Sequence, residues 1–186
     1  MAILMLPGCG GSGEKHWQTI WERSLDAASR FEPSSWTEPN LEDWIGALDR
    51  AVAMAPRPPV LVAHSLACLL VGHWSASASR SPVSGAFLVS VPDPRLSAFP
   101  EAARSFGNVP EQRLRFPSLV VSSGNDPFGS AAYSKAMSDV WGAGFIRVGD
   151  LGHINAASGH GEWPKGQKLL EAFIAGLSNA PFNRVS

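Results

Sequence analysis

Residues 59–70 read PVLVAHSLACLL and join a short apolar run to a helix-like segment through one His-Ser pair. The run at 59–63 is apolar and rich in valine, which is typical of a strand buried on both faces of a parallel sheet. The residues from Leu66 to Ala78 form a helix pattern. The sequence therefore predicts that Ser65 lies in a tight turn where a strand passes directly into a helix.

The same alternation of apolar runs and helix patterns continues along the chain. Short apolar runs predict strands at residues 2–6, 59–63, 85–91, 118–122 and 145–148, with a weaker candidate at 30–36. Amphipathic spacing and capping residues predict helices at residues 14–29, 40–53, 66–78, 131–140 and 165–177. Strands that alternate with helices indicate βαβ units with right-handed crossovers. The expected fold is an α/β three-layer sandwich with a mostly parallel, doubly wound sheet of about six strands.

Length and composition limit the possible classes of protein. A chain of 186 residues has the size of one domain, so we assign residues 1–186 to a single domain. Hydrophobic residues make up 45% and charged residues 17%, which excludes general disorder. The net charge of −1 and the lack of a basic stripe argue against a nucleic-acid or anionic-membrane partner. No apolar run approaches the ~20 residues that span a bilayer.

The two cysteines and the N-terminus bear on the compartment. Cys9 and Cys68 cannot form a disulfide framework, and a reducing compartment suits them. The apolar start at 1–6 lacks a basic region and is closed by Pro7-Gly8, so it does not resemble a targeting signal. We therefore expect a cytoplasmic protein.

Ser65 lies where the strained turn called a nucleophile elbow would hold a reactive serine. The usual pattern, G-x-S-x-G, needs small residues two before and two after the serine, and here Ala63 and Ala67 take those places. The alternative is that Ser65 only caps a helix. Asp126 and His153 favour catalysis, because each follows a later predicted strand and the order Ser, acid, His suits this chemistry. Parallel strands bring their carboxyl ends to one edge, so the three side chains are expected to meet there.

Backbone amides are expected to complete this site. One usual oxyanion donor is the N–H of the residue after the nucleophile, which here is Leu66. A second donor comes from a loop after an adjacent strand, and the glycine-rich residues 7–13 supply one. We favour the Cys9 N–H as this second donor, because Gly8 gives the backbone just before it more conformational freedom. Each such donor contributes roughly 10²–10³ in rate.

Other residues compete for roles around this site. Asp93 follows the run at 85–91 and is the alternative acid, since some hydrolases carry the acid one strand earlier. Trp17, Phe99 and Trp163 are the candidate walls of a substrate pocket.

The segment Pro92–Pro117 is the longest connection in the expected fold and holds five prolines. Loops of this length in a compact domain are often functional. The segment either overhangs the site, presenting Leu96, Phe99 and Phe106, or crosses the surface passively.

These motifs resemble those of the small serine hydrolases of the α/β-hydrolase superfamily, the group around retinoblastoma-binding protein nine and its bacterial relatives. The matching stretches span nearly the whole chain and are LPG at 6–8, HW at 16–17, DW at 43–44, VAHSLAC at 62–68, GNDPF at 124–128 and GHINAASGHGEWP at 152–164. The resemblance implies a minimal fold without a large cap and the strand order 2-1-3-4-5-6. It also implies that Ser65, Asp126 and His153 form a catalytic triad. The chain departs from the family at Ala67, where glycine is usual, and alanine fits if the turn leaves room for one methyl group.

The expected activity is hydrolysis of small carboxylic esters through a covalent acyl-enzyme on Ser65, with no cofactor and no metal. One alternative is a dinucleotide-binding protein, because Gly8, Gly10 and Gly13 fit G-x-G-x-x-G between a strand and a helix. Another is a non-catalytic protein-binding module on the same fold, although no motif indicates a protein partner. The histidines lack the spacing of zinc ligands.

Overall fold

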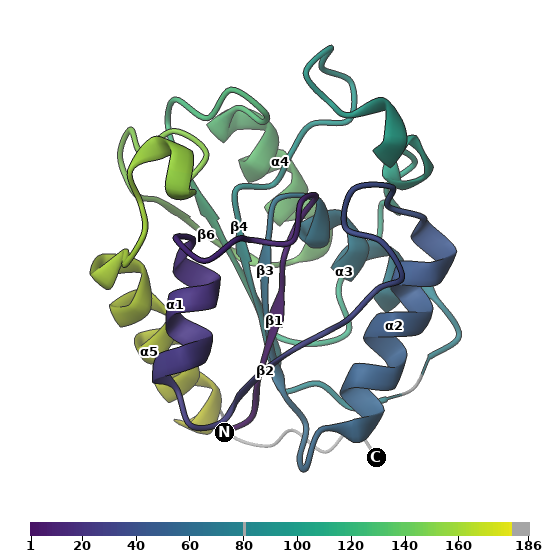
Figure 1. Ribbon diagram of the computed structural model, residues 1–186, viewed down its shortest axis with the longest axis vertical. Coiled ribbons are helices and arrows are strands. Elements are labelled where there is room, and N and C mark those ends of the chain that lie inside the picture. Colours follow the sequence, from purple (N-terminus) through teal and green to yellow (C-terminus); the bar gives the residue numbers. More distant parts are fainter. Residues whose placement is uncertain (80, 180–186) are drawn as a thin grey trace.

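Six parallel strands form the central sheet of the computed structural model, which describes residues 1–79 and 81–179 (Figure 1). In chain order the strands are β1 (Ile3–Leu6), β2 (Ala28–Arg30), β3 (Val60–His64), β4 (Gly85–Val89), β5 (Ser118–Ser122) and β6 (Gly144–Arg147). They lie in the order β2-β1-β3-β4-β5-β6, and each neighbouring pair is parallel. The predicted fold class and strand order are therefore confirmed. The order reverses between β1 and β3, where a crevice opens at the carboxyl ends of parallel strands.

Helices cover both faces of the sheet and make the outer two layers (Figure 1). One face carries α1 (Trp17–Ser24) and α5 (Pro164–Asn179), and the other carries α2 (Leu41–Met54), α3 (Leu66–Ala76) and α4 (Ala131–Trp141). Two short 3₁₀ helices, Glu101–Phe106 and Ala156–Ser158, lie in the connections. Among the helices of the described residues, none combines the length and hydropathy needed to cross a membrane.

Successive residues of each central strand enter different cores. In β3, Leu61 and Ala63 pack with α2, α3 and α4, whereas Val60 and Val62 pack with α1 and α5. Both sets of side chains are buried, so the strand has no polar face. This is why the central strands are continuous apolar runs in the sequence and do not alternate with polar residues.

Two elements differ most from their predicted bounds. The weak strand candidate at 30–36 is wrong: β2 covers Ala28–Arg30, where Ile3 of β1 pairs with Ala28. The helix predicted at 14–29 is shorter, because His16 caps its start by accepting from the Gln18 amide. At its other end, α1 stops at Ser24, because the following residues form the turn that leads to β2. Pairing with β1 has overridden the helix pattern there.

The segment Pro92–Pro117 contains the 3₁₀ helix Glu101–Phe106 and is anchored on the α2–α3 face. Phe106 is fully buried, and its ring lies 5.4 Å from that of Trp44. The expectation that Phe106 overhangs the site is therefore wrong, because its side chain packs in the core against Trp44. Leu96 remains exposed on the segment.

Gln18 joins the carboxyl ends of β1 and β3 on the inside of the molecule. Its Nε2 donates to the carbonyl oxygens of Leu6 (3.1 Å) and Val62 (2.9 Å), and its Oε1 accepts from Ser12 Oγ (2.7 Å). The side chain is fully buried. It therefore fixes the two strand ends that bound the crevice and also holds the glycine-rich loop after β1.

Replacing Gln18 should destabilise the fold strongly. Gln18→Met keeps the volume but removes both donors, which leaves two buried carbonyl groups without this partner at a cost of about 1–3 kcal/mol each. We expect the free energy of unfolding, measured by urea titration, to fall by about 2–4 kcal/mol. A loss below about 0.5 kcal/mol would show that the two carbonyl groups do not depend on Gln18.

Candidate active site

Ser65 occupies a strained turn between β3 and α3. Its backbone has φ 55° and ψ −124°, a region that residues other than glycine rarely adopt. The Ser65 amide donates to the Val89 carbonyl oxygen of β4 (2.9 Å), which ties the turn to the sheet. Ala63 and Ala67 are both completely buried beside it. This geometry is that of the predicted nucleophile elbow, with alanine in place of both usual glycines.

The loop after β1 packs directly against this turn. A Cβ atom on Gly8 would lie 2.9 Å from the His64 carbonyl oxygen and 3.0 Å from Ser65 Cβ, so only glycine allows this approach. The loop then turns through positive φ at Gly10 and Gly11. Cys9 is thereby brought to the same cavity as Ser65 and Leu66.

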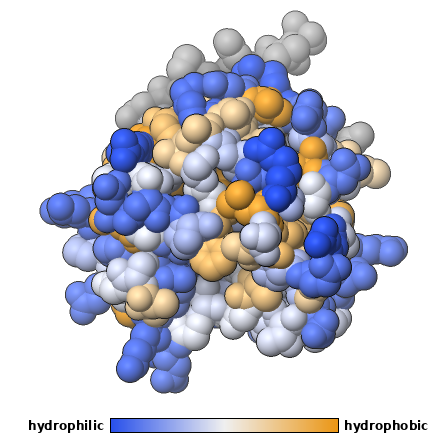
Figure 2. All heavy atoms as spheres, turned by 90° about the horizontal axis from the view of Figure 1, so that it is seen from above, coloured by the Kyte–Doolittle hydropathy of each residue, from blue (hydrophilic) through white to orange (hydrophobic). Residues whose placement is uncertain are grey.

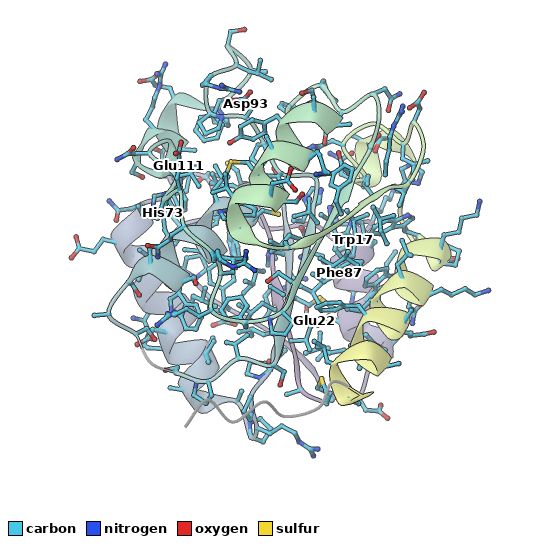
Figure 3. The ribbon with its side chains drawn as sticks, turned by 180° about the vertical axis from the view of Figure 1, so that it is seen from behind. Trp17, Glu22, His73, Phe87, Asp93 and Glu111 are labelled. Atoms are coloured by element: carbon cyan, nitrogen blue, oxygen red, sulfur yellow. The ribbon has the colours of Figure 1, made fainter. Side chains whose placement is uncertain are left out.

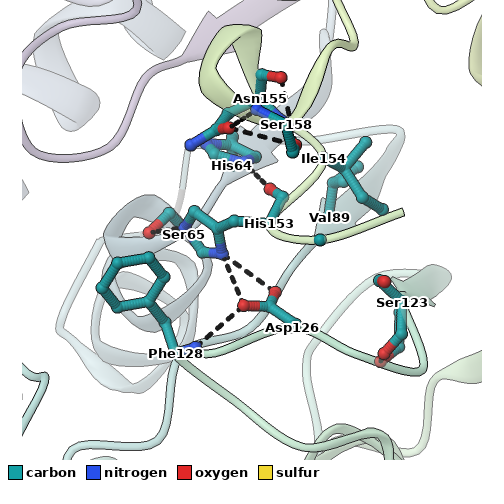
Figure 4. A network of polar contacts seen from close by, with 12 residues as sticks. His64, Ser65, Val89, Ser123, Asp126, Phe128, His153, Ile154, Asn155 and Ser158 are labelled. Atoms are coloured by element: carbon teal, nitrogen blue, oxygen red, sulfur yellow. Dashed lines mark hydrogen bonds and ion pairs between the residues drawn. The ribbon is translucent and has the colours of Figure 1, made fainter. Parts of the chain in front are cut away.

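Three side chains from three strand ends form one chain of hydrogen bonds (Figure 4). Ser65 Oγ lies 2.9 Å from His153 Nε2, and His153 Nδ1 lies 2.9 Å from each carboxylate oxygen of Asp126. Because the Asp126 carboxylate can only accept, Nδ1 carries the ring proton and Nε2 is free to accept from the serine hydroxyl. Asp126 also accepts from the Phe128 amide (2.9 Å), which fixes the carboxylate plane.

The alternative acid, Asp93, has a different partner. Its carboxylate oxygens accept from Arg95 Nε (2.9 Å) and Arg95 Nη2 (2.8 Å). The hydrogen bond from the Arg95 side chain lowers the pKa of Asp93. Asp93 is buried, at 7% exposed. The structure thus brings Asp126, and not Asp93, to the ring of His153.

A cavity of about 210 Å³ opens beside Ser65. Its lining contains no Asp, Glu, Lys or Arg and is formed by Cys9, Ser65, Leu66, Pro92, Phe99, Pro100, Phe128, His153 and Asn155. Seen from the end of the sheet where the strands finish, the surface has a central apolar patch among hydrophilic residues (Figure 2). The arrangement places the Ser65 hydroxyl beside a small, mostly apolar hollow.

Of the three predicted pocket residues, only Phe99 lines this cavity. Trp17 and Trp163 are wrong: Trp17 is fully buried and Trp163 is 5% exposed. Trp163 stacks on Trp21 with ring centroids 5.7 Å apart. The Trp17 ring lies 5.3 Å from that of Trp163, on the side of the sheet that α1 and α5 cover (Figure 3). The packing of α1 against the start of α5 takes both indoles into the core, away from the cavity.

Sequence reasoning missed several residues that surround Ser65. Pro92 and Pro100 come from the segment after β4, so that segment does border the site. Phe128 lies with its ring centroid 4.6 Å from that of His153. Asn155 also lines the cavity. Phe128 lies two residues after Asp126 and Asn155 two residues after His153, within the GNDPF and GHIN motifs. Their closeness in sequence to Asp126 and His153 could have indicated that they border the site.

Two further histidines lie against the site and stay neutral. Their ring centroids form a series from His16 to His64 to His153, with 4.8 Å at each step. Burial is the main cause that lowers the pKa of His16 from 6.5 to about 4, and the charge of His153 adds to it. Burial likewise lowers the pKa of His64 well below 6.5. Neither His16 nor His64 is therefore a cation beside Asp126 near neutral pH.

The glycine-rich loop does not form the dinucleotide site that its pattern allows. Such a site needs a helix whose first amides adjoin the glycines. Here α1 begins only at Trp17, and Arg30 Nη1 donates to the Gly11 carbonyl oxygen (2.7 Å). Across residues 1–79 and 81–179, no three His, Cys, Asp or Glu side chains gather in a group that could hold a metal ion.

The chain is similar to a known protein family and to several solved structures. The model of a family described as serine hydrolase matches residues 3–172. A YdeN-like hydrolase from Pectobacterium atrosepticum superposes with a TM-score of 0.83 at 28% identity, over 95% of this chain and 91% of that chain. The ydeN gene product from B. subtilis gives 0.79 at 21% identity, over 94% of this chain and 98% of that one.

A more distant likeness concerns the fold alone. An esterase from Thermogutta terrifontis gives a TM-score of 0.67 at 13% identity, over 95% of this chain and 90% of that chain. Among curated proteins, none matches the chain.

The buried neutral histidines predict that stability falls in mild acid. Both pKa values are lowered in the folded state, so below pH 6.5 the unfolded chain binds more protons than the folded one. The two neutral rings should leave the free energy of unfolding unchanged above pH 6.5. As the pH drops from 6.5 toward about 4, the free energy of unfolding should fall by up to about 1.4 kcal/mol per pH unit for each ring.

Urea titrations between pH 7 and pH 5 test this expectation. His16→Asn keeps an acceptor at the start of α1 but cannot titrate, so it should reduce the slope of stability against pH. An unchanged slope in His16→Asn would mean that His16 is not the source of the acid sensitivity.

Proposed function

Since the chain belongs to the serine hydrolase family, we propose that it cleaves small carboxylic esters through an acyl-enzyme on Ser65. The observation that carries this proposal is the hydrogen-bonded series from Ser65 Oγ through His153 to Asp126, which opens onto a cavity. A serine with its hydroxyl on an unprotonated imidazole nitrogen is activated as a nucleophile. No cofactor is required for this chemistry.

In the first half of the reaction, Ser65 Oγ attacks the carbonyl carbon of the ester and its proton passes to His153 Nε2. The new Oγ–C bond converts the carbonyl oxygen to an oxyanion. As the C–O bond to the alcohol breaks, His153 returns its proton to the leaving alkoxide. An acylated Ser65 and a free alcohol result.

In the second half, water takes the place of the alcohol. His153 removes a proton from the water, whose oxygen attacks the acyl carbon, and the same proton then returns to Ser65 Oγ as the acyl bond breaks. The products are a carboxylic acid and the original serine. Throughout, Asp126 holds the ring tautomer and stabilises the imidazolium without being protonated.

The amides of Leu66 and Cys9 are the proposed oxyanion donors. Both residues line the cavity with Ser65, and Leu66 is the first residue of α3, so its N–H has no acceptor within that helix. The positive end of the α3 dipole points to the same place. The close approach of Gly8 to the turn supports the role of Cys9, because it brings the loop backbone next to Ser65.

The shape of the cavity supports small, uncharged acyl groups. Phe99, Phe128, Leu66 and two prolines provide its apolar lining, and its volume is about 210 Å³. Among the described residues that line it, none is Asp, Glu, Lys or Arg. A charged acyl group would lose its hydration without gaining a partner.

Labelling with a fluorophosphonate tests the nucleophile directly. Wild-type protein should react with one equivalent, and peptide mapping should locate the adduct on Ser65. Ser65→Ala should not react and should lose activity by ~10⁴–10⁶-fold. Ser90→Ala is the matched control. Like Ser65, Ser90 directly follows a strand and has a positive φ, but it is buried and does not line the cavity. Full labelling of Ser65→Ala would exclude Ser65 as the nucleophile.

The two candidate acids should differ sharply in their effect on turnover. Asp126→Asn should lower kcat by roughly 10⁴-fold, because the amide favours the wrong tautomer of His153. Asp93→Asn removes only a partner of Arg95 and should change kcat by less than about tenfold. If the two losses came out reversed in steady-state assays, the acid would be Asp93.

Acyl-chain length tests the size of the pocket. Each buried methylene adds ~0.8 kcal/mol of transition-state binding, but only while the cavity has room for it. On nitrophenyl esters we expect kcat/KM to peak between acetyl and butyryl and to fall by about eight carbons. A value that still rises through chains of about twelve to sixteen carbons would require a long acyl channel that is not part of this proposal.

A further inference from the structure

The segment that carries His153 is bound at four consecutive residues, 151–154, which we call the base segment. Two side chains accept from its amides: Ser123 Oγ from Leu151 N–H (2.8 Å) and Asn125 Oδ1 from Gly152 N–H (2.7 Å). Two others donate to its carbonyl oxygens: His64 Nε2 to that of His153 (2.9 Å) and Trp17 Nε1 to that of Ile154 (2.8 Å). Each residue of the base segment is thus held by one side chain from elsewhere in the fold.

The base segment has an unusual backbone conformation at two of its residues. Gly152 has φ 61° and Ile154 has φ 47°. A positive φ is unusual for any residue with a side chain and is a clear outlier for a β-branched one. At Ile154 such a conformation is strained and persists only where the surroundings over-determine it. Ile154 is also completely buried, so core packing and the two carbonyl hydrogen bonds act together on it.

His64 links the base segment to the turn that carries Ser65. It is the last residue of β3 and directly precedes Ser65. Since the His153 carbonyl can only accept, His64 Nε2 must carry the ring proton (Figure 4). Its ring is buried and packs edge-on against the His153 ring, with centroids 4.8 Å apart. One side chain therefore connects the backbone of the nucleophile to that of the base.

Trp17 holds the other carbonyl from the α1 side. Its indole is fully buried and lies in a cluster with Trp21 and Trp163, at centroid distances of 4.5 Å and 5.3 Å. The cluster leaves the indole little freedom, so the Nε1–H has a fixed direction. Neither Trp17 nor His64 is among the residues that line the cavity, so neither is placed to touch a substrate.

We propose that His64 and Trp17 are positioning residues that keep the His153 ring aimed between Ser65 and Asp126. This inference rests on the proposed function and explains how the base is held. The His153 side chain makes hydrogen bonds at both nitrogens, each at 2.9 Å, so a small rotation of its backbone would lengthen one of them. Misplacement by about 1 Å can lower turnover by about 10²-fold.

Two tryptophans on one helix provide a matched test. Trp17→Phe and Trp21→Phe each remove an indole N–H and part of a ring from the same buried cluster. Trp21 Nε1 donates to the Glu162 carbonyl oxygen (2.8 Å), which is outside the base segment. Kinetics on nitrophenyl acetate and thermal unfolding should be measured for both variants.

We expect both variants to lose stability, but only Trp17→Phe to lose turnover. Its kcat should fall at least about tenfold, with KM within about twofold of wild type, because orientation of the base affects the chemical step and not binding. Trp21→Phe should keep kcat within about twofold. Equal kcat values in the two variants would overturn the role of Trp17.

A rescue experiment tests His64. His64→Leu removes the donor, whereas His64→Gln retains an N–H that can reach the His153 carbonyl oxygen. We expect kcat to fall by about 10–100-fold in His64→Leu and to recover to within about fivefold of wild type in His64→Gln. Equal losses in the two variants would overturn the role of His64.

Fluorophosphonate labelling separates this inference from the proposed function. If wild-type protein does not react, the proposed function fails and the positioning role fails with it. If wild-type protein reacts at Ser65 and the paired variants react at equal rates, only the positioning role is overturned. Slower reaction in Trp17→Phe than in Trp21→Phe supports both.

Discussion

The left-handed turn at Ser65 is the constraint on which the rest of the site depends. A backbone with φ 55° and ψ −124° lifts the side chain out of the line of β3, and it leaves little space on either side. This explains the small neighbours Ala63 and Ala67 and the glycine at position 8, whose missing Cβ lets the loop after β1 approach the turn. Because the sheet order reverses between β1 and β3, that loop and the turn meet at one crevice.

The side chains around the proposed nucleophile are mostly buried and uncharged, and Asp126 is the anion that contacts His153. Asp126 is the carboxylate that faces His153, whereas the Asp93 carboxylate forms an ion pair with Arg95. His16 and His64 are held neutral because their pKa values are lowered by burial. An imidazolium that forms on His153 during turnover would therefore find one anion and no competing cation among these neighbours. Burial has the same effect on Cys68, since it raises the thiol pKa and keeps this residue of α3 uncharged.

The sequence predicted the sheet well because the central strands are buried on both faces and so appear as unbroken apolar runs. It failed at β2, whose three residues Ala28, Ser29 and Arg30 lie at the sheet edge and include no apolar run. Ser65, Asp126 and His153 could be chosen because each follows a strand, and strand ends are visible in the sequence. The walls of the cavity could not be chosen in this way. Whether a tryptophan faces the core or a cavity depends on how α1 packs against α5, and Trp17 and Trp163 both face the core.

A crystal structure of the protein after reaction with a small alkyl fluorophosphonate would show whether Ser65 is the nucleophile and whether the Leu66 and Cys9 amides face the oxyanion. The phosphorus mimics the tetrahedral carbon of the proposed intermediate, and its oxygen stands where the oxyanion would form. We expect a bond from Ser65 Oγ to phosphorus, with one phosphonyl oxygen about 2.7–3.1 Å from the amide nitrogens of both Leu66 and Cys9. Phosphorus on another residue would exclude Ser65 as the nucleophile, and a phosphonyl oxygen that faces away from both amides would exclude them as the oxyanion donors.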